Sequence, residues 1–143
     1  MNTEEVKLKL EGIKWLDEEI KNLQLELQYL EQGLFKKSVL IQTKVQTSRV
    51  NNAESEVVHT IKLRQDLEER LAEIISERLE SSRLIDKASN PLERAVLRMA
   101  YVNRLDIWDI EKRVGRAKST IYRIKKDGIE SIAKAMTKRA NVI

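Results

Sequence analysis

The chain has 143 residues, with 27 Lys+Arg against 23 Asp+Glu and a formal net charge of +4. Its 4 glycines, 1 proline and 4% aromatic residues disfavour sheet architectures, which need frequent turns and β-branched or aromatic pairs, and they favour long helices. The absence of cysteine excludes disulfides and thiolate metal sites, and it fits a reducing compartment.

The charge is distributed unevenly along the chain. Residues 1–35 hold 4 basic and 8 acidic side chains, whereas residues 91–143 hold 13 basic and 6 acidic side chains. A basic C-terminal part that follows an acidic front indicates either a nucleic-acid partner or a solvated face rich in Lys and Arg. Charge alone leaves both interpretations open.

The first predicted helix has apolar residues alternately three and four positions apart. They are Ile13, Leu16, Ile20, Leu23, Leu27, Leu30 and Leu34. This spacing over three heptads predicts a helix with a coiled-coil seam, and the mostly acidic or neutral flanks favour a basic partner helix. Trp15, Leu25 and Tyr29 lie outside the seam and predict that the helix buries a second side, as in a bundle.

Residues 36–53 are rich in Ser, Thr, Gln, Asn and β-branched side chains, which predicts a linker. A second helical stripe follows, with apolar residues at Val57, Val58, Ile61, Leu67, Leu71, Ile74, Ile75 and Leu79. This segment also carries Arg64, Arg70 and Arg78, the positive charges that the first helix lacks. Residues 1–88 are therefore predicted to form long helices that pair antiparallel, as a coiled-coil-like hairpin within one chain or across a dimer.

This helical front shows no pattern of a catalytic, cofactor or metal site. His59 is the only histidine, so one chain cannot assemble a multi-histidine metal site or His-dependent catalysis. No Gly-rich phosphate loop occurs. No apolar run approaches the roughly 20 residues of a membrane span, and the acidic start is not that of a signal peptide. We expect an all-α cytoplasmic protein that is not an enzyme, needs no cofactor and does not contact a membrane.

The C-terminal part, residues 89–143, begins with a helix-start signal. Asn90 can cap a helix, Pro91 fits the first turn, and Glu93 can reach back to complete a capping box. Asp106 is the predicted cap of a short second helix. Two consecutive helices are therefore predicted before the next glycine.

That glycine, Gly115, follows the second helix, where a tight turn needs the positive φ that glycine adopts freely. A third helix is predicted to begin near Ala117. Helix, turn with glycine and helix match the pattern of a helix-turn-helix domain. Its predicted core positions are Ile110, Val114, Ile121 and Ile124.

The outward positions of the third helix are basic and carry no acid before Asp127. The cations are Arg116, Lys118, Arg123, Lys125 and Lys126. Cations bind phosphates through counterion release, and Arg, Lys, Ser and Thr also reach base edges in a major groove. The predicted base contacts are Lys118, Ser119 and Arg123, and the predicted backbone contacts are Arg116, Thr120, Tyr122 and Lys126. A three-helix bundle that packs against a protein remains the alternative.

The stretch Tyr101–Ile124 resembles the helix-turn-helix of region 4 of bacterial sigma factors. It resembles more closely the small phage-encoded transcriptional regulators of the ArpU and RinA type, which join a helical, coiled-coil-like N-terminal part to this module. The matching positions are Tyr101, Trp108, Ile110, Val114, Gly115, Ile121, Tyr122, Arg123 and Ile124. The resemblance covers about residues 90–135 and implies a DNA-binding regulator of late or packaging genes of a phage or prophage.

Two residues depart from the helix-turn-helix pattern. Glu111 stands where such motifs usually carry a small Ala, and Ala117 stands where they usually carry the Ser that caps the recognition helix. A missing cap costs about 1 kcal/mol of local stability. A degenerate version of the motif that binds protein instead of DNA therefore stays among the alternatives.

We expect a sequence-specific regulator that binds double-stranded DNA as a homodimer, because one small module reads too few base pairs for tight discrimination against a genome. The front helices would set the oligomeric state or contact RNA polymerase. One alternative is a helical interaction protein that binds RNA polymerase, a sigma factor or another phage partner. Another is a small terminase subunit, which also combines a helix-turn-helix with helical oligomerisation segments.

Overall fold

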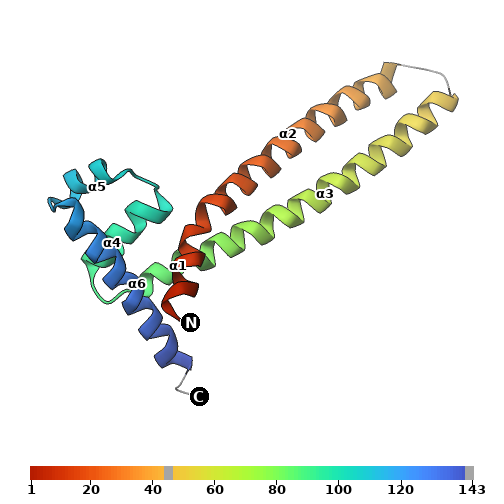
Figure 1. Ribbon diagram of the computed structural model, residues 1–143. Coiled ribbons are helices and arrows are strands. Elements are labelled where there is room, and N and C mark those ends of the chain that lie inside the picture. Colours follow the sequence, from red (N-terminus) through yellow and green to blue (C-terminus); the bar gives the residue numbers. More distant parts are fainter. Residues whose placement is uncertain (44–46, 141–143) are drawn as a thin grey trace. The chain divides into compact units, whose positions relative to one another are not determined.

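The structure is a computed structural model that describes the backbone of residues 1–43 and 47–140 and the side chains of residues 1–33 and 54–139. The described residues form helices and no strand, which confirms the predicted all-α fold (Figure 1). In chain order these are α1 (Thr3–Glu11), α2 (Ile13–Thr43), α3 (Thr47–Arg83), the 3₁₀ turn η1 (Leu84–Lys87), α4 (Pro91–Leu97), the π-helical turn η2 (Arg98–Val102), α5 (Ile107–Val114) and α6 (Lys118–Ala140).

The helices form two compact units. One unit is Glu18–Ile75, and the other combines Met1–Asp17 with Ser76–Ile143. The predicted domain boundary after residue 88 does not coincide with this division, because α1 belongs to the C-terminal unit. We call the two units the hairpin unit and the C-terminal unit.

The hairpin unit consists of the paired parts of α2 and α3, which run antiparallel within one chain (Figure 1). Its side chains are linked by Arg64–Glu31 at 3.4 Å and Arg70–Glu19 at 3.3 Å. The third predicted arginine, Arg78, pairs with Asp17 inside the C-terminal unit. The predicted basic partner helix is therefore α3, and the antiparallel pairing is confirmed. Exposed ion pairs of this kind contribute only about 0–1 kcal/mol each to the free energy of unfolding. Their main effect is therefore on the register in which α2 and α3 pair.

The structure corrects the linker predicted over residues 36–53. Helix α2 continues to Thr43 and α3 begins at Thr47, and residues 44–46 lie outside the described part of the chain. The predicted linker contains neither Gly nor Pro. The polar and β-branched residues that suggested a loop cost at most about 0.7 kcal/mol each inside a helix, which is too little to end it.

The seam of α2 is only partly covered. Ile13 is buried and Leu16, Ile20, Leu23, Leu27 and Leu30 are half-buried, whereas the side chain of Leu34 lies outside the described residues. The expected second buried side is not found within one chain: Trp15, Leu25 and Tyr29 are 66%, 55% and 77% exposed. The reason is that one partner helix covers one face of α2.

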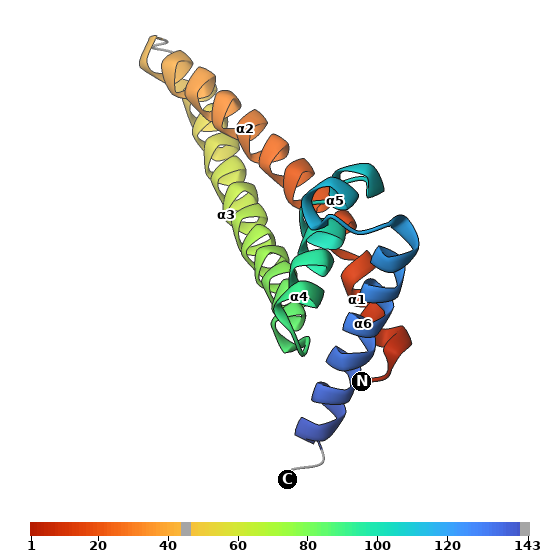
Figure 2. The same ribbon diagram turned by 90° about the vertical axis from the view of Figure 1, so that its left-hand side faces the viewer.

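The C-terminal unit has two apolar clusters. The first joins α1, η1, α4 and α6: Val6, Leu10, Ile13, Leu84, Ile85, Ala88, Leu97, Ile129, Ile132 and Ala133. The second lies under the helix-turn-helix: Val96, Ile110, Ile121 and Ile124, with Val114 half-buried against them. All four predicted core positions of the motif therefore contribute to this cluster. Figure 2 shows α1 beside α6, the arrangement that the first cluster produces.

Helix α4 crosses α6 closely at Gly128. A Cβ atom at this position would lie 2.8 Å from Leu97 Cδ1 and 3.4 Å from the Cβ of Glu93. Glu93 is buried at the same crossing, where its Oε1 accepts a hydrogen bond of 2.7 Å from the Ser89 hydroxyl. The absence of a side chain at Gly128 thus allows α4 to support the middle of α6.

The predicted capping box at the start of α4 is only half correct. Asn90 Oδ1 accepts a hydrogen bond from the backbone N–H of Glu93 at 2.8 Å, as predicted. The Glu93 carboxylate, however, accepts from the neighbouring Ser89 hydroxyl instead of reaching back to the Asn90 backbone. The buried Glu93 carboxyl group thus has hydrogen-bond partners in the hydroxyls of Ser89 and Ser131.

Candidate nucleic-acid interface

The turn between α5 and α6 is fixed by local hydrogen bonds. Asp106 Oδ1 caps α5 by accepting from the backbone N–H of Asp109 at 2.9 Å. Gly115 follows α5 with φ 70° and ψ 31°, and its N–H donates to the carbonyl oxygen of Glu111 at 2.8 Å. The predicted helix cap at Asp106 and the predicted positive φ at Gly115 are both confirmed. The left-handed conformation of Gly115 lets the chain turn sharply, so that α6 starts three residues later.

Helix α6 begins without a side-chain cap of the usual kind. Ala117 precedes its first residue, and the carbonyl oxygen of Ala117 accepts from the N–H of Ile121 at 3.0 Å. Alanine has no side-chain oxygen, so the first N–H groups of α6 stay available to water or to a bound anion. This is the departure from the helix-turn-helix pattern that the sequence indicates.

The predicted site residues occupy the start of α6 and the turn before it. Six of them are exposed: Arg116, Lys118, Ser119, Tyr122, Arg123 and Lys126. The seventh, Thr120, is half-buried. Ser119, Arg123 and Lys126 follow the spacing i, i+4, i+7 and therefore share one face of α6, with Lys118 and Tyr122 in the next row. The structure brings the predicted base contacts together on a single helix.

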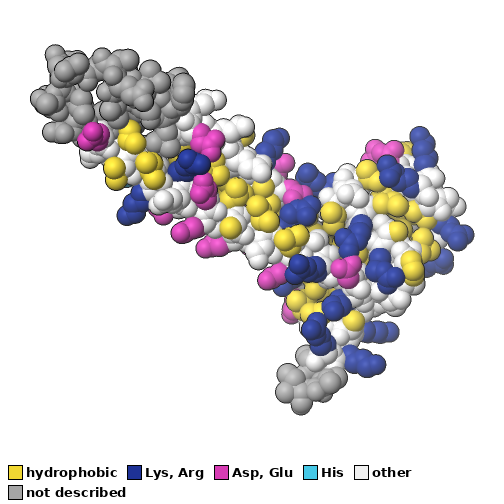
Figure 3. Space-filling model, turned by 180° about the vertical axis from the view of Figure 1, so that it is seen from behind, with side chains coloured by type: hydrophobic (Ala, Val, Ile, Leu, Met, Phe, Trp, Pro, Cys, Tyr) yellow, Lys and Arg dark blue, Asp and Glu magenta, His cyan; other side chains and the backbone are white. Residues whose placement is uncertain are grey.

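The cations of this face have no acidic partner among the side chains that the structure describes. Among the described side chains, Arg116, Lys118, Arg123 and Lys126 form no ion pair, whereas Arg64 and Arg70 of the hairpin unit are paired. Figure 3 shows Lys and Arg side chains gathered over the C-terminal unit. Unpaired, exposed cations are the groups that bind phosphates and release counterions.

Two further residues, Lys125 and Tyr101, join this face. The Lys125 Nζ lies 5.0 Å from the ring centroid of Tyr101 and 5.6 Å from that of Tyr122, and Lys118 Nζ lies 5.9 Å from Tyr122. Burial lowers the pKa of Lys125, the charge of Glu11 raises it, and that of Lys7 lowers it. Burial, with a smaller effect of Glu11, raises the pKa of Tyr101. The positive charge of Lys125 and Lys126 can be read from the sequence. The contact of Lys125 with Tyr101, by contrast, depends on the fold.

A cavity of about 360 Å³ opens beside this face, between α1 and α6. It is lined by Thr3, Glu4, Lys7, Tyr101, Tyr122, Lys125, Lys126 and Ile129. Three lysines and one glutamate therefore surround it. Lys7 lies far from the other two lysines in the sequence, and no motif marks it.

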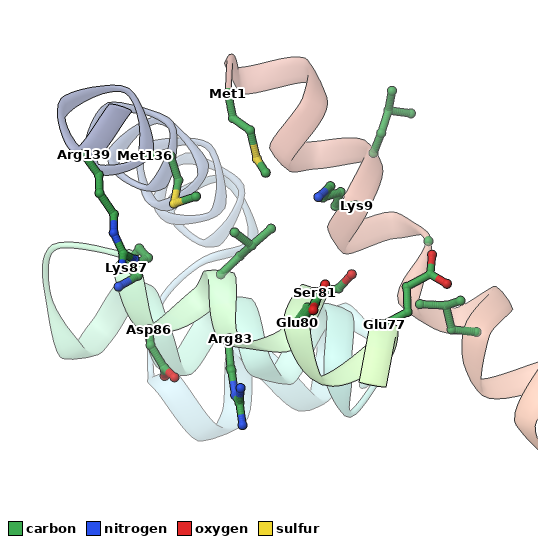
Figure 4. Close-up of a pocket in the computed structure, with 14 residues that line it drawn as sticks. Met1, Lys9, Glu77, Glu80, Ser81, Arg83, Asp86, Lys87, Met136 and Arg139 are labelled. Carbon is green, nitrogen blue, oxygen red and sulfur yellow. The ribbon is translucent and has the colours of Figure 1, made fainter. Parts of the chain in front are cut away.

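A second cavity in the C-terminal unit, of about 780 Å³, has a mixed lining. Figure 4 shows Arg139 and Lys87 at one end and Glu77 and Glu80 at the other. Lys9, Arg83 and Asp86 also line this cavity. Because four basic and three acidic residues line this cavity, its lining has almost no net charge and does not favour an anionic ligand over a cationic one.

The described residues contain no group of three or more His, Asp or Glu side chains that could hold a metal ion. In the same part of the chain, no helix has the length and hydropathy needed to cross a membrane.

The chain was compared with known protein families, curated proteins and solved structures. Residues 34–133 match the model of a family described as Protein of unknown function (DUF1492). The matched range covers well over half of the chain and contains α3, α4, α5 and most of α6. No curated protein and no solved structure matches the chain.

Proposed function

The chain belongs to the DUF1492 family, whose description states no function. From the geometry at the start of α6 we propose that it is a sequence-specific DNA-binding transcriptional regulator. One observation carries the proposal: the start of α6 presents cations on an exposed face, with no ion pair to any described side chain, directly after a capped helix and a left-handed glycine turn. This is the arrangement in which a helix-turn-helix protein presents its recognition helix to DNA.

In this proposal α6 enters the major groove, which is wide enough for an α-helix. Arg123, Lys118 and Ser119 contact base edges, because Arg and Lys bind guanine through O6 and N7 and Ser binds several bases. Arg116, Tyr122 and Lys126 contact phosphates and fix the register. Thr120 is half-buried and contributes least.

The sequence resemblance supports a more specific proposal. The helix-turn-helix stretch is similar to region 4 of sigma factors and to ArpU- and RinA-type regulators, and the long helices before it match the architecture of the latter. We therefore propose a regulator of late or packaging genes in a phage or prophage. The front helices would then serve in dimer formation or in contact with RNA polymerase.

The hairpin unit supports a homodimer. Among its described residues, Ile74 is the only buried apolar side chain, whereas Leu25, Tyr29, Val58 and Ile61 are exposed. Figure 3 shows hydrophobic side chains at the surface of the hairpin. We propose that a second copy covers this surface, because a helix pair with so little buried area is marginal by itself and because two recognition helices are needed to read two half-sites.

Sedimentation equilibrium at tens of micromolar is expected to give twice the 16.7 kDa mass of one chain. Ile61→Glu, which adds a charge to the exposed apolar surface, is expected to shift the equilibrium toward monomer. Lys62→Glu is the matched control, because it alters an exposed neighbour that is already charged. A monomer in the unaltered protein would contradict the dimer, and a ring of eight or more copies would favour the small-terminase alternative.

Fluorescence anisotropy with duplexes that tile the neighbouring region of the source genome tests DNA binding directly. One duplex is expected to bind at least about 10³-fold more tightly than the others at physiological salt. With the two phosphate-binding cations Arg116 and Lys126 in each copy, a dimer neutralises about four phosphates, so log K should fall with log salt at a slope near −3.6. Weak, uniform binding that vanishes at physiological salt would replace this proposal with the protein-partner alternative.

A further inference from the structure

We propose that the cavity between α1 and α6 is a phosphate-binding site, in which Lys7, Lys125 and Lys126 hold one phosphate group of the DNA backbone beside the recognition helix. The inference rests on the proposed DNA binding and extends it to α1, a helix outside the helix-turn-helix. It makes α1 a DNA-contacting element as well as a part of the core.

The lining of the cavity favours an anion. Three lysines and Thr3 line a volume of about 360 Å³, together with the single acidic residue Glu4. Lysine binds phosphate as a point charge through three N–H donors. The tyrosines that complete the lining provide walls of low polarity, where an ammonium–phosphate attraction is stronger than in bulk water.

Lys125 is held in place before any anion binds. Its Nζ lies over the ring of Tyr101 and over that of Tyr122, at 5.0 Å and 5.6 Å from their centroids. The side chain is half-buried, so less conformational entropy is lost when it binds a ligand. A pre-positioned cation distinguishes this cavity from a chance cluster of mobile surface lysines.

Lys7 and Lys125 repel each other across the cavity. Burial is the main cause that lowers the pKa of Lys125; the charge of Glu11 raises this pKa, and the smaller effect of the Lys7 charge lowers it. An anion between the two ammonium groups would remove the repulsion.

The cavity lies next to the proposed DNA-reading face. Tyr122 and Lys126 line the cavity and also belong to the exposed face that includes Arg123. A duplex that presents bases to Arg123 would carry its sugar–phosphate backbone past these two residues. The phosphate at the cavity would then fix the position of α6 in the groove.

The variant Lys7→Gln tests the site, and Lys9→Gln is its matched control. Both lysines are exposed on α1, but Lys9 lines the other, mixed cavity. In anisotropy titrations with the target duplex, Lys7→Gln is expected to reduce the salt slope by up to about 0.9 per copy, the contribution of the one phosphate that three lysines share, whereas Lys9→Gln leaves the slope unchanged. Equal slopes for the two variants would overturn the proposal for DNA phosphate.

A titration with inorganic pyrophosphate, without DNA, distinguishes a DNA phosphate from a free phosphate compound. The probe is the amide NMR signals of Tyr122 and Lys125 in the unaltered protein and in both variants. If no duplex binds, the proposed function fails, but pyrophosphate shifts that are lost in Lys7→Gln alone would retain the phosphate site for a free ligand. If neither the slope nor the shifts depend on Lys7, the phosphate site itself is wrong.

Discussion

Leu10→Ala is expected to lower the opening free energy of α6 by about 2–5 kcal/mol, the usual cost of removing a fully buried leucine side chain. Leu10 is 0% exposed in the cluster that joins α1 to Ile129 and Ile132 of α6. Native-state hydrogen exchange of the α6 amides measures this free energy within the C-terminal unit alone. The loss should appear in α6, although the mutated residue lies more than 100 positions earlier in the chain.

Leu8→Ala provides the control on the same helix. Leu8 is 64% exposed, so its truncation should change the protection of α6 by no more than about 0.5 kcal/mol. If Leu10→Ala and Leu8→Ala gave equal protection, α1 would not belong to the cooperative core. The predicted boundary after residue 88 would then describe the folding unit better than the division that the structure shows.

Arg123→Ala is expected to cost about 1–3 kcal/mol in affinity for the target duplex and to reduce the discrimination between target and scrambled duplexes. Arg123 is exposed in the middle of the basic face, and among the described side chains it has no ion pair to lose. Its truncation therefore removes a contact to DNA without disturbing a protein contact. Anisotropy with both duplexes at one fixed salt concentration measures the discrimination.

Lys126→Ala is the comparison variant, one turn further along the same face. A phosphate contact carries no sequence information, so this change should weaken both duplexes about equally and reduce the salt slope by about 1 per copy. Discrimination that survives Arg123→Ala would remove Arg123 from the base-reading residues. If Lys126→Ala weakened binding to the target duplex but not to the scrambled duplex, Lys126 would be a base-reading residue.

Much of the helix-turn-helix could be predicted from the sequence, because its signals act over a few residues. Asn90 and Asp106 cap helices through hydrogen bonds three residues along the chain, and Gly115 provides a conformation that other residues avoid. The core of the motif was predictable from the helical spacing of Ile110, Ile121 and their neighbours. The exposed basic face follows from the same spacing, since residues opposite the core face solvent.

The linker was not predictable in this way. Residues 36–53 combine weak helix formers without Gly or Pro, so their helix propensity differs only slightly from that of a loop. Over residues 36–43 and 47–53 the backbone is helical, and α2 and α3 lengthen accordingly. Small propensity differences are readily outweighed by tertiary context.

Local sequence thus specified the helix-turn-helix, the caps at Asn90 and Asp106, the turn at Gly115 and the cationic face of α6. The packing of α1 against α6 and the cavity of Lys7, Lys125 and Tyr101 depended on the folded chain. The physical reason is the distance along the chain over which each interaction acts. Hydrogen-bonded caps and helical periodicity act within a few residues, whereas burial of Val6 and Leu10 depends on partners over 70 residues away, and no spacing along the chain encodes such a pair.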